Sequence, residues 1–171
     1  MSSIEKAKPV DARLLAGIGA QSFIESHGHS ASAVDIEKYK EEKFTEDVLY
    51  AELVNPENIY HIIYHDNIPA GYSKIILNAE HPNVSLQNVT KLERIYLLKQ
   101  FYGLKLGQEF FNFNVELSKR NHQNGMWLFV WKENPRAINF YTKAGFKIIG
   151  SHDFKISDRH SNPNHQMLLV Y

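Results

Sequence analysis

Cysteine is absent from the 171 residues of this chain. Its absence excludes a disulfide framework, a thiolate metal site and a cysteine nucleophile, because each of these needs a sulfhydryl group. Long apolar runs are also missing. No window approaches the ~18 apolar residues of a membrane span, and residues 1–10 hold no apolar core of signal-peptide length. We therefore expect a cytoplasmic protein without a membrane partner.

An excess of one charge is lacking as well. The chain has 19 Lys and Arg residues against 19 Asp and Glu residues, so its formal net charge is zero. A nucleic-acid partner is not expected, because proteins that bind nucleic acids usually carry a basic surface. The chain is 43% hydrophobic and 12% aromatic, which argues against disorder. Its length suits one domain.

Hydrophobic periodicity along the chain alternates between that of strands and that of helices. The predicted order is one strand, three helices, three strands, a helix, a strand, a helix and two strands. One mixed sheet covered by helices is the natural packing for this order, so we expect a single α/β (α+β) domain over residues 1–171. The predicted strands span residues 3–8, 59–65, 70–77, 91–98, 125–131, 146–150 and 166–170. The predicted helices span residues 9–25, 33–44, 45–54, 105–121 and 135–144.

Single residues and short motifs mark the ends of several of these predicted helices and strands. Thr45 and Asn134 each stand where a side-chain oxygen can cap the start of a helix. Gly145 follows the last helix at the position where glycine commonly ends one. Asp66-Asn67 is a turn signal between two strands, which predicts a hairpin.

One candidate for phosphate binding is the segment that leads from the fourth predicted strand into the fourth helix. It contains Gly103 in a short turn and Gly107 in the first helical turn. The first N–H groups of a helix have no intrahelical partner, so they can bind a phosphate. An ordinary strand-to-helix turn would look the same. The glycine spacing fits neither a Walker loop nor a dinucleotide fingerprint.

A second segment, residues 134–146, is a capped helix with a glycine stop. Together the two segments resemble the GNAT superfamily of acetyl-CoA-dependent N-acetyltransferases, and within it the bacterial spermidine/spermine type most. The resemblance covers roughly residues 89–150. The motifs that carry it are Glu-Arg-Ile-Tyr at 93–96, Trp-Leu-Phe-Val-Trp-Lys-Glu-Asn at 127–134 and Asn-x-x-Ala-x-x-Phe-Tyr-x-x-x-Gly-Phe at 134–146.

The resemblance implies a mixed sheet of six to seven strands, flanked by helices and splayed where acetyl-CoA binds. One departure concerns the pyrophosphate loop, which in the superfamily is usually Gln/Arg-x-x-Gly-x-Gly/Ala. Tyr102 stands at the Gln/Arg position, Lys105 stands at the first glycine, and Gly107 matches. A side chain at residue 105 hinders the approach of the backbone to a phosphate, although Lys105 offers charge instead. The departure therefore bears on the affinity for CoA.

The resemblance also implies which residues bind the co-substrate, acetyl-CoA. The strand after Arg94 would run beside the pantetheine arm, the glycine turn would hold the pyrophosphate, and the last helix would contact the pantetheine. The cofactor-binding residues so implied are Ile95, Tyr96, Leu97, Tyr102, Gly103, Leu104, Lys105, Leu106, Gly107, Gln108, Asn134, Phe140 and Lys143.

Two catalytic roles follow from the same resemblance. Tyr141 would protonate the leaving thiolate, because a phenol with a pKa of about 10 is protonated at neutral pH. Glu93 would deprotonate the incoming amine through a water; its alternative role is that of a surface carboxylate paired with a neighbouring lysine. Since the chain has no cysteine, an acyl-cysteine intermediate is impossible, and we expect direct transfer within a ternary complex.

The acceptor is expected to be a small-molecule amine, with polyamines such as spermidine first. A peptide amine is an alternative, and so is an acyl-CoA-binding domain without catalysis. The acceptor would be contacted by Phe23 in the first predicted helix and by His27 and His29 in the loop after it. No metal is expected: His61 and His65 lie about 13 Å apart if they share a strand, too far for one ion. The chain could be a monomer or a homodimer.

Charge is unevenly distributed along the chain. Residues 31–57 hold eight acidic residues against three lysines, whereas residues 91–120 hold six basic residues against three acidic ones. Two solvated helix faces of opposite sign would explain this pattern. The functional interpretation is that the basic stretch attracts the anionic CoA and the acidic stretch attracts a cationic amine.

Overall fold

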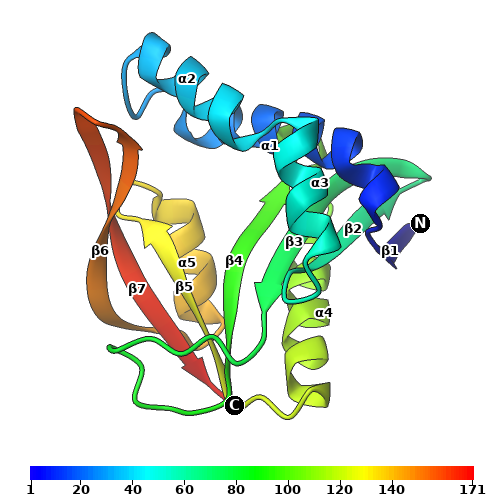
Figure 1. Cartoon of the computed structure of the whole chain (residues 1–171). Helices are drawn as coiled ribbons and strands as arrows, with labels where there is room; N and C mark the ends of the chain where they lie inside the picture. The colour runs from blue at the N-terminus through cyan, green and yellow to red at the C-terminus, as the bar shows by residue number, and fades with distance from the viewer. The chain divides into compact units, whose positions relative to one another are not determined.

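A computed structural model describes all residues from Met1 to Tyr171. Seven strands form one sheet in the order β1-β2-β3-β4-β5-β7-β6, accompanied by five α-helices (Figure 1). The strands are β1 Ser2–Lys6, β2 Ile59–His65, β3 Ile68–Ile76, β4 Val89–Leu97, β5 Gly125–Trp131, β6 Lys147–Ser157 and β7 His160–Val170. The α-helices are α1 Ala12–His27, α2 Ala33–Lys43, α3 Glu46–Val54, α4 Leu106–Arg120 and α5 Pro135–Lys143, and short 3₁₀ turns cover Pro9–Asp11 and Lys99–Phe101.

Contacts divide the chain into two compact units. The first unit comprises Met1–Ile75 and Arg94–Asn114, and the second comprises Ile76–Glu93 and Val115–Tyr171. Strand β4 therefore contributes its first half to the second unit and its last half to the first. No helix has the length and apolar composition that crossing a membrane requires.

In the first unit, β1, β2 and β3 pair antiparallel and α1 packs against α3. The turn between β2 and β3 consists of Asp66 and Asn67, both with positive φ (48° and 63°), as the two-residue hairpin turn requires. The core of this unit contains side chains with at most 1% exposure from both helices and strands: Leu15, Leu49, Tyr60, Ile62, Ile63, Tyr72 and Phe110.

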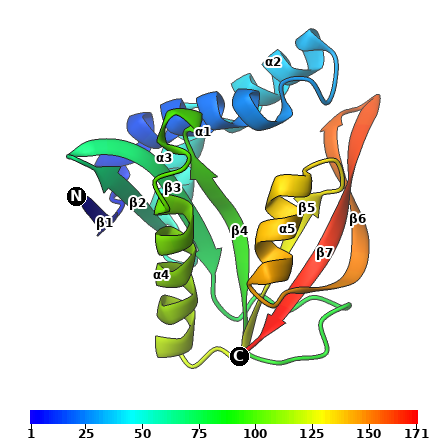
Figure 2. The same ribbon diagram turned by 180° about the vertical axis from the view of Figure 1, so that it is seen from behind.

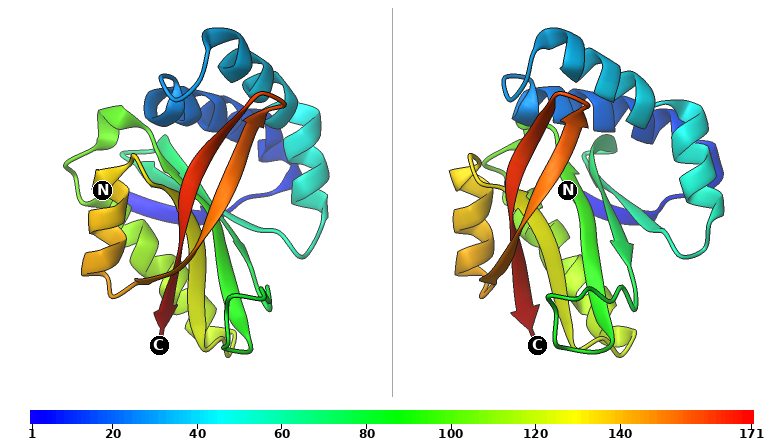
Figure 3. Two further views of the ribbon diagram at one scale, coloured as in Figure 1. Left: turned by 90° about the vertical axis from the view of Figure 1, so that its left-hand side faces the viewer. Right: turned by 60° about the vertical axis from the view of Figure 1, so that its left-hand side comes forward.

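In the second unit, β5 pairs antiparallel with β7, and β7 pairs with β6 in a long twisted hairpin (Figure 3). Helix α5 lies alongside β5 in both the front and the back view (Figures 1 and 2). The parallel ladder between β4 and β5 has three residue pairs and ends at Lys91–Trp127. The loop from β3 to β4 is held on this unit by a hydrogen bond from the Trp127 indole to the Ala79 carbonyl (2.7 Å).

The predicted order of elements is confirmed, and so are the local signals. The Thr45 hydroxyl accepts a hydrogen bond from the Val48 N–H (3.3 Å), and the Asn134 side chain accepts one from the Ala137 N–H (3.2 Å). The lengths predicted for the last two strands are wrong, because β6 and β7 have 11 residues each. Strand β6 lies at the edge of the sheet and is mostly exposed, so it has no continuous apolar pattern that would reveal its length. Its pairing with β7 keeps it in the sheet.

Candidate active site

The end of β4 is held close to β3 by a glycine. A Cβ atom at Gly71 would lie 2.0 Å from the Tyr96 carbonyl oxygen, so only glycine permits this approach. The Leu98 N–H also donates to the Ala70 carbonyl in β3 (2.9 Å). Successive residues of a strand direct their N–H and C=O groups to opposite edges. The backbone groups of Ile95 and Leu97 therefore point to the edge of β4 that faces away from β3.

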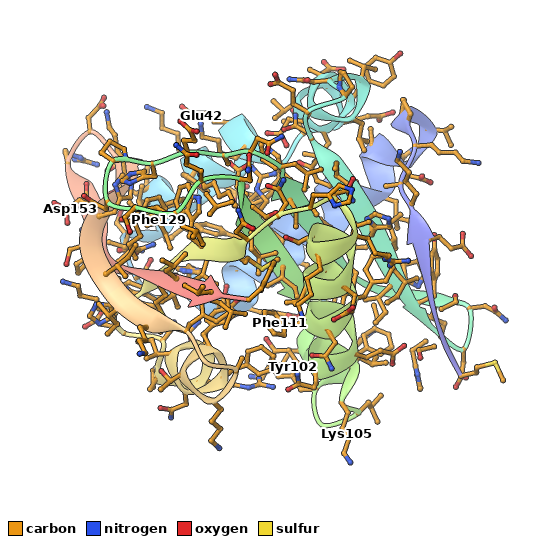
Figure 4. The ribbon with its side chains drawn as sticks, turned by 90° about the horizontal axis from the view of Figure 1, so that it is seen from below. Glu42, Tyr102, Lys105, Phe111, Phe129 and Asp153 are labelled. Carbon is orange, nitrogen blue, oxygen red and sulfur yellow. The ribbon has the colours of Figure 1, made fainter.

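The turn after β4 leads directly into α4. Gly103 has a φ of +83° and Lys105 a φ of +61°, and residues 102–105 are all exposed. Figure 4 shows Lys105 at this turn, with its side chain extending away from the ribbon. A Cβ atom at Gly103 would meet no atom within 4 Å, and one at Gly107 would meet only a Leu97 methyl group at 3.9 Å. Open space therefore lies against the first N–H groups of α4, where an anion can approach.

Lys105 has the backbone conformation that glycine adopts at no cost. The left-handed region costs a residue with a Cβ roughly 1–2 kcal/mol. Lys105, which stands where the superfamily loop has its first glycine, therefore adopts a left-handed conformation that is strained for a lysine. Lys105 directly precedes α4, so its charge lies near the N-terminus of that helix.

A buried ion cluster includes Arg94 of β4, the residue directly before Ile95. The sequence did not predict this cluster. The Glu52 carboxylate in α3 accepts hydrogen bonds from the Lys74 ammonium (3.4 Å) and the Arg94 guanidinium (3.2 Å), as well as from the Tyr60 hydroxyl. Burial raises the pKa of the Tyr60 phenol, which keeps it a donor. Glu52 and Arg94 are 42 residues apart, so no local pattern could reveal the pair. The cluster anchors α3 to β4 at the residue preceding Ile95.

The three expected acceptor contacts lie near the C-terminal end of α1, in the first unit. Phe23 is 3% exposed, and its ring stacks on Tyr39 (4.6 Å) and His27 (5.3 Å), so it packs α1 against α2. His29 is exposed in the following loop. Burial, assisted by the nearby His29, lowers the pKa of His27 to about 4, so the imidazole is neutral at pH 7.

His27 contacts its neighbour Ser26 through Nδ1. The Ser26 hydroxyl lies 2.7 Å from His27 Nδ1 and 2.9 Å from the Ser22 carbonyl oxygen. A neutral imidazole has one donor and one acceptor nitrogen, so it can either donate to this hydroxyl or accept from it.

Helix α5 carries the expected residues of the second unit. The Asn134 side chain is engaged as the N-cap, Phe140 and Tyr141 are half-buried, and Lys143 is exposed. The Tyr141 ring packs edge-on against Phe140 (5.5 Å) and Phe146 (5.4 Å). Burial raises the pKa of the Tyr141 phenol, so this hydroxyl stays protonated at neutral pH and can donate.

Glu93 is half-buried in the portion of β4 that belongs to the second unit. Its carboxylate lies 4.0 Å from the Lys91 ammonium, which is the lysine pairing that the sequence offered as the alternative to catalysis. Lys91 in turn lies over the rings of Trp127 (5.2 Å) and Phe129 (5.5 Å). The distance to Lys91 is that of an ion pair and is longer than a hydrogen bond.

Within each unit, the structure brings together only part of the expected set. In the first unit, residues 95–97, 102–105 and the start of α4 are contiguous, and Phe23 contacts His27. In the second unit, Asn134, Phe140 and Tyr141 share α5. No group of three His, Asp or Glu side chains is arranged to hold a metal ion.

The comparisons with known proteins place the chain in a family. The sequence model of the acetyltransferase (GNAT) family matches residues 22–146. An uncharacterized N-acetyltransferase from Lactobacillus delbrueckii subsp. lactis is 32% identical over 142 residues, which is 82% of each chain. This protein therefore belongs to the GNAT family, and it is an N-acetyltransferase.

Solved structures show the same fold at low sequence identity. PaiA N-acetyltransferase from Thermoplasma acidophilum, crystallised with coenzyme A, superimposes with a TM-score of 0.79 at 21% identity, covering 100% of this chain and 99% of that one. A ribosomal-protein alanine N-acetyltransferase from Escherichia coli gives a TM-score of 0.72 at 13% identity, covering 99% and 94%. These likenesses confirm the expected fold.

Proposed function

We propose that this enzyme transfers the acetyl group of acetyl-CoA directly to a primary amine within a ternary complex. The single observation that carries this proposal is the left-handed turn at residues 103–105, which opens space at the first N–H groups of α4. A pyrophosphate fits the positive end of a helix dipole with unpaired N–H donors. Gly103 and Gly107 leave room for its oxygens, and Lys105 adds a positive charge beside them.

In the proposed reaction, the amine nitrogen attacks the thioester carbonyl carbon, and the C–S bond then breaks. The N–H groups of Ile95 and Leu97 point away from β3, so one of them can donate to the carbonyl oxygen as negative charge develops on it. Tyr141 gives its proton to the departing sulfur. Burial raises the pKa of the Tyr141 phenol, so the hydroxyl carries its proton at neutral pH.

The amine must lose a proton before or during the attack. We assign this step to Glu93, acting through a water molecule. The carboxylate is half-buried and lies 4.0 Å from the Lys91 ammonium. An ionised carboxylate can accept the proton and pass it to solvent.

The acceptor that the sequence favours is a polyamine, and the surface of the first unit supports a cationic acceptor. Six of the eight acidic residues between positions 31 and 57 are exposed, namely Glu37, Glu41, Glu42, Glu46, Asp47 and Glu57. Only Glu37 and Glu42 have lysine partners, on α2 itself. The negative surface attracts any ammonium group, so it serves the N-terminal amine of a peptide as well.

A test combines binding and turnover. Acetyl-CoA should raise the melting temperature, and free thiol should appear when spermidine, spermine, diamines or N-terminal peptides are added. Tyr141→Phe should lower kcat by about 100-fold or more with little change in acetyl-CoA affinity, because it removes only the proton donor. Tyr50→Phe, at a side chain that is 53% exposed, is the matched control. Tight acetyl-CoA binding without thiol release for any amine would refute the proposed reaction.

A further inference from the structure

A carboxylate on α1 holds the entry to the turn that follows β4, and the proposed reaction does not use it. Glu25 lies near the C-terminal end of α1, two residues before His27. Its Oε2 accepts a hydrogen bond from the backbone N–H of Lys99 (2.8 Å), which is 74 residues further along the chain. Lys99 begins the 3₁₀ turn that leads into residues 102–105. Glu25 therefore connects α1 to the segment that carries the candidate phosphate site.

The 3₁₀ turn at Lys99–Phe101 has no side-chain cap of its own. Its N-cap residue is Leu98, an apolar side chain that cannot accept a hydrogen bond. The first N–H groups of a helix have no partner within that helix, so a polar side chain usually supplies the acceptor. A carboxylate makes the stronger, charge-assisted bond. Here the acceptor comes from another helix, so the bond also fixes where the turn begins relative to α1.

Both oxygens of the Glu25 carboxylate are engaged. Oε1 accepts a hydrogen bond from Gln21 Nε2 (2.9 Å), and Oε2 accepts the one from Lys99. Gln21 and Glu25 are four residues apart on α1, so their side chains are neighbours on the helix surface. The bond to Gln21 holds the carboxylate in the orientation that reaches Lys99, which distinguishes Glu25 from a freely rotating surface carboxylate.

The exposed turn is held from its two ends. Phe101 and Leu106 are buried in the core of the first unit (7% and 3% exposed), whereas residues 102–105 between them are exposed. This exposed segment includes the left-handed conformations described above. Its course therefore depends on how its ends are fixed, and Glu25 supports the entry end through Lys99.

We propose that Glu25 is a positioning residue for acetyl-CoA binding, because its bond to Lys99 keeps residues 102–105 in the conformation that receives the pyrophosphate. The inference rests on the proposed function, in which this turn and the start of α4 bind that group. Glu25 acts through the backbone and touches neither substrate. A turn that is ordered before binding loses less conformational freedom when the ligand arrives, so the affinity is higher.

Loss of this bond should weaken the binding of acetyl-CoA and leave the chemical step unchanged. Without Glu25, the turn samples other conformations, and only the fraction in the original one is competent to bind. Once acetyl-CoA is bound, the turn has the same conformation in the variant and in the unmodified enzyme. We therefore expect a higher KM for acetyl-CoA with an unchanged kcat, because the loss arises on binding and not in the transition state.

Three variants of Glu25 separate the hydrogen bond from the charge. Glu25→Ala removes the acceptor and keeps a strong helix former on α1. Glu25→Gln loses the charge but keeps an oxygen that can accept from the Lys99 N–H. Glu25→Asp keeps the charge but withdraws the carboxylate from Lys99 by one methylene group, and it replaces the alanine variant if that one fails to fold. The matched control is Glu116→Ala, which removes an exposed carboxylate ten residues after the start of α4.

Hydrogen exchange of the free enzyme tests the bond without turnover. The acceptor protects the Lys99 amide, so the peptide covering residues 98–105 should exchange faster in Glu25→Ala than in the unmodified protein. Saturating CoA should reduce this difference, because the bound ligand orders the turn. Equal exchange rates in the two free proteins would overturn the inference.

Calorimetry with CoA and steady-state kinetics measure the consequence for binding. Glu25→Ala and Glu25→Asp should raise both the Kd of CoA and the KM for acetyl-CoA by about five-fold or more, which corresponds to about 1 kcal/mol. Their kcat should stay unchanged, and Glu25→Gln and Glu116→Ala should bind CoA as the unmodified enzyme does.

The opposite outcomes are distinct. Unchanged CoA affinity in the alanine variant, or an equal loss in Glu25→Gln, would overturn the positioning role of Glu25. A parallel fall in kcat would assign Glu25 a general structural role and overturn it as well. If the unmodified protein releases thiol with no amine, the proposed reaction is refuted, and the calorimetric comparison still decides the role of Glu25.

Discussion

Replacement of Lys105 by glycine tests whether the turn before α4 is strained. Lys105 has a φ of +61°, a left-handed conformation in which a Cβ atom costs roughly 1–2 kcal/mol. Glycine avoids that clash but loses more backbone entropy on folding, by roughly 0.5–1 kcal/mol. The side chain is exposed, so its removal leaves no cavity. We therefore expect Lys105→Gly to increase the free energy of unfolding by about 0.5–1 kcal/mol.

The stability assay needs a control for the lost charge. A gain of this size should raise Tm by about 1–4 °C in a domain of this length. Lys105→Ala also removes the charge but keeps the Cβ atom, so it should leave Tm close to that of the unmodified protein. Equal melting temperatures for the glycine and alanine variants would refute the strain at residue 105.

The same pair of variants separates steric from electrostatic effects on CoA binding. The backbone strain is present with and without CoA, so relief of strain changes Tm but not affinity. Both variants lack the ammonium group, so a difference between them reports the Cβ atom alone. We expect the glycine variant to bind CoA several-fold more tightly than the alanine variant in a calorimetric titration. Equal affinities would show that residue 105 does not hinder the phosphate.

Two further predictions concern stability. Asn134→Ala removes the N-cap bond to the Ala137 N–H and should lower the free energy of unfolding by about 1 kcal/mol in a denaturant titration, whereas Asn134→Asp should retain most of it. Burial, with Lys6 nearby, lowers the pKa of His61 to about 4 from its ordinary 6.5. Between these values only the unfolded chain binds the proton, so stability should fall with decreasing pH, by up to about 3 kcal/mol. His61→Gln should flatten this dependence, an exposed His122→Gln should not, and identical pH profiles for the two variants would contradict the assignment.

Elements with local signals were predictable from the sequence. Examples are the helix caps at Thr45 and Asn134 and the turn at 66–67. Each depends on residues within three positions of each other, so the local sequence is enough to predict it. The order of strands and helices follows from periodicity for the same reason. The full length of the β6–β7 hairpin was not predictable, because most residues between 150 and 165 are polar and only the pairing between the strands makes them a sheet.

Some features of the candidate site were likewise predictable from local sequence, and others were not. The motifs at 93–96 and 134–146 were sufficient to predict an N-acetyltransferase, since the residues of each motif are contiguous in the chain and carry the family pattern. Their spacing could not tell that Phe23 is buried in the packing of α1 against α2, or that Arg94 pairs with Glu52. Those facts depend on which side chains meet after folding.

The sequence by itself determined the family, the order of elements, the absence of an acyl-cysteine route and the helix caps, because each depends on composition or on neighbours along the chain. Only the tertiary structure decided that Lys105 takes a left-handed conformation, that Glu52 joins Lys74 and Arg94, and that Glu25 accepts a hydrogen bond from Lys99. A backbone angle in a tight turn, the pairing of distant charges and the bond between a helix and a distant turn are all set by the atoms that folding brings around a residue, and these come from distant parts of the chain.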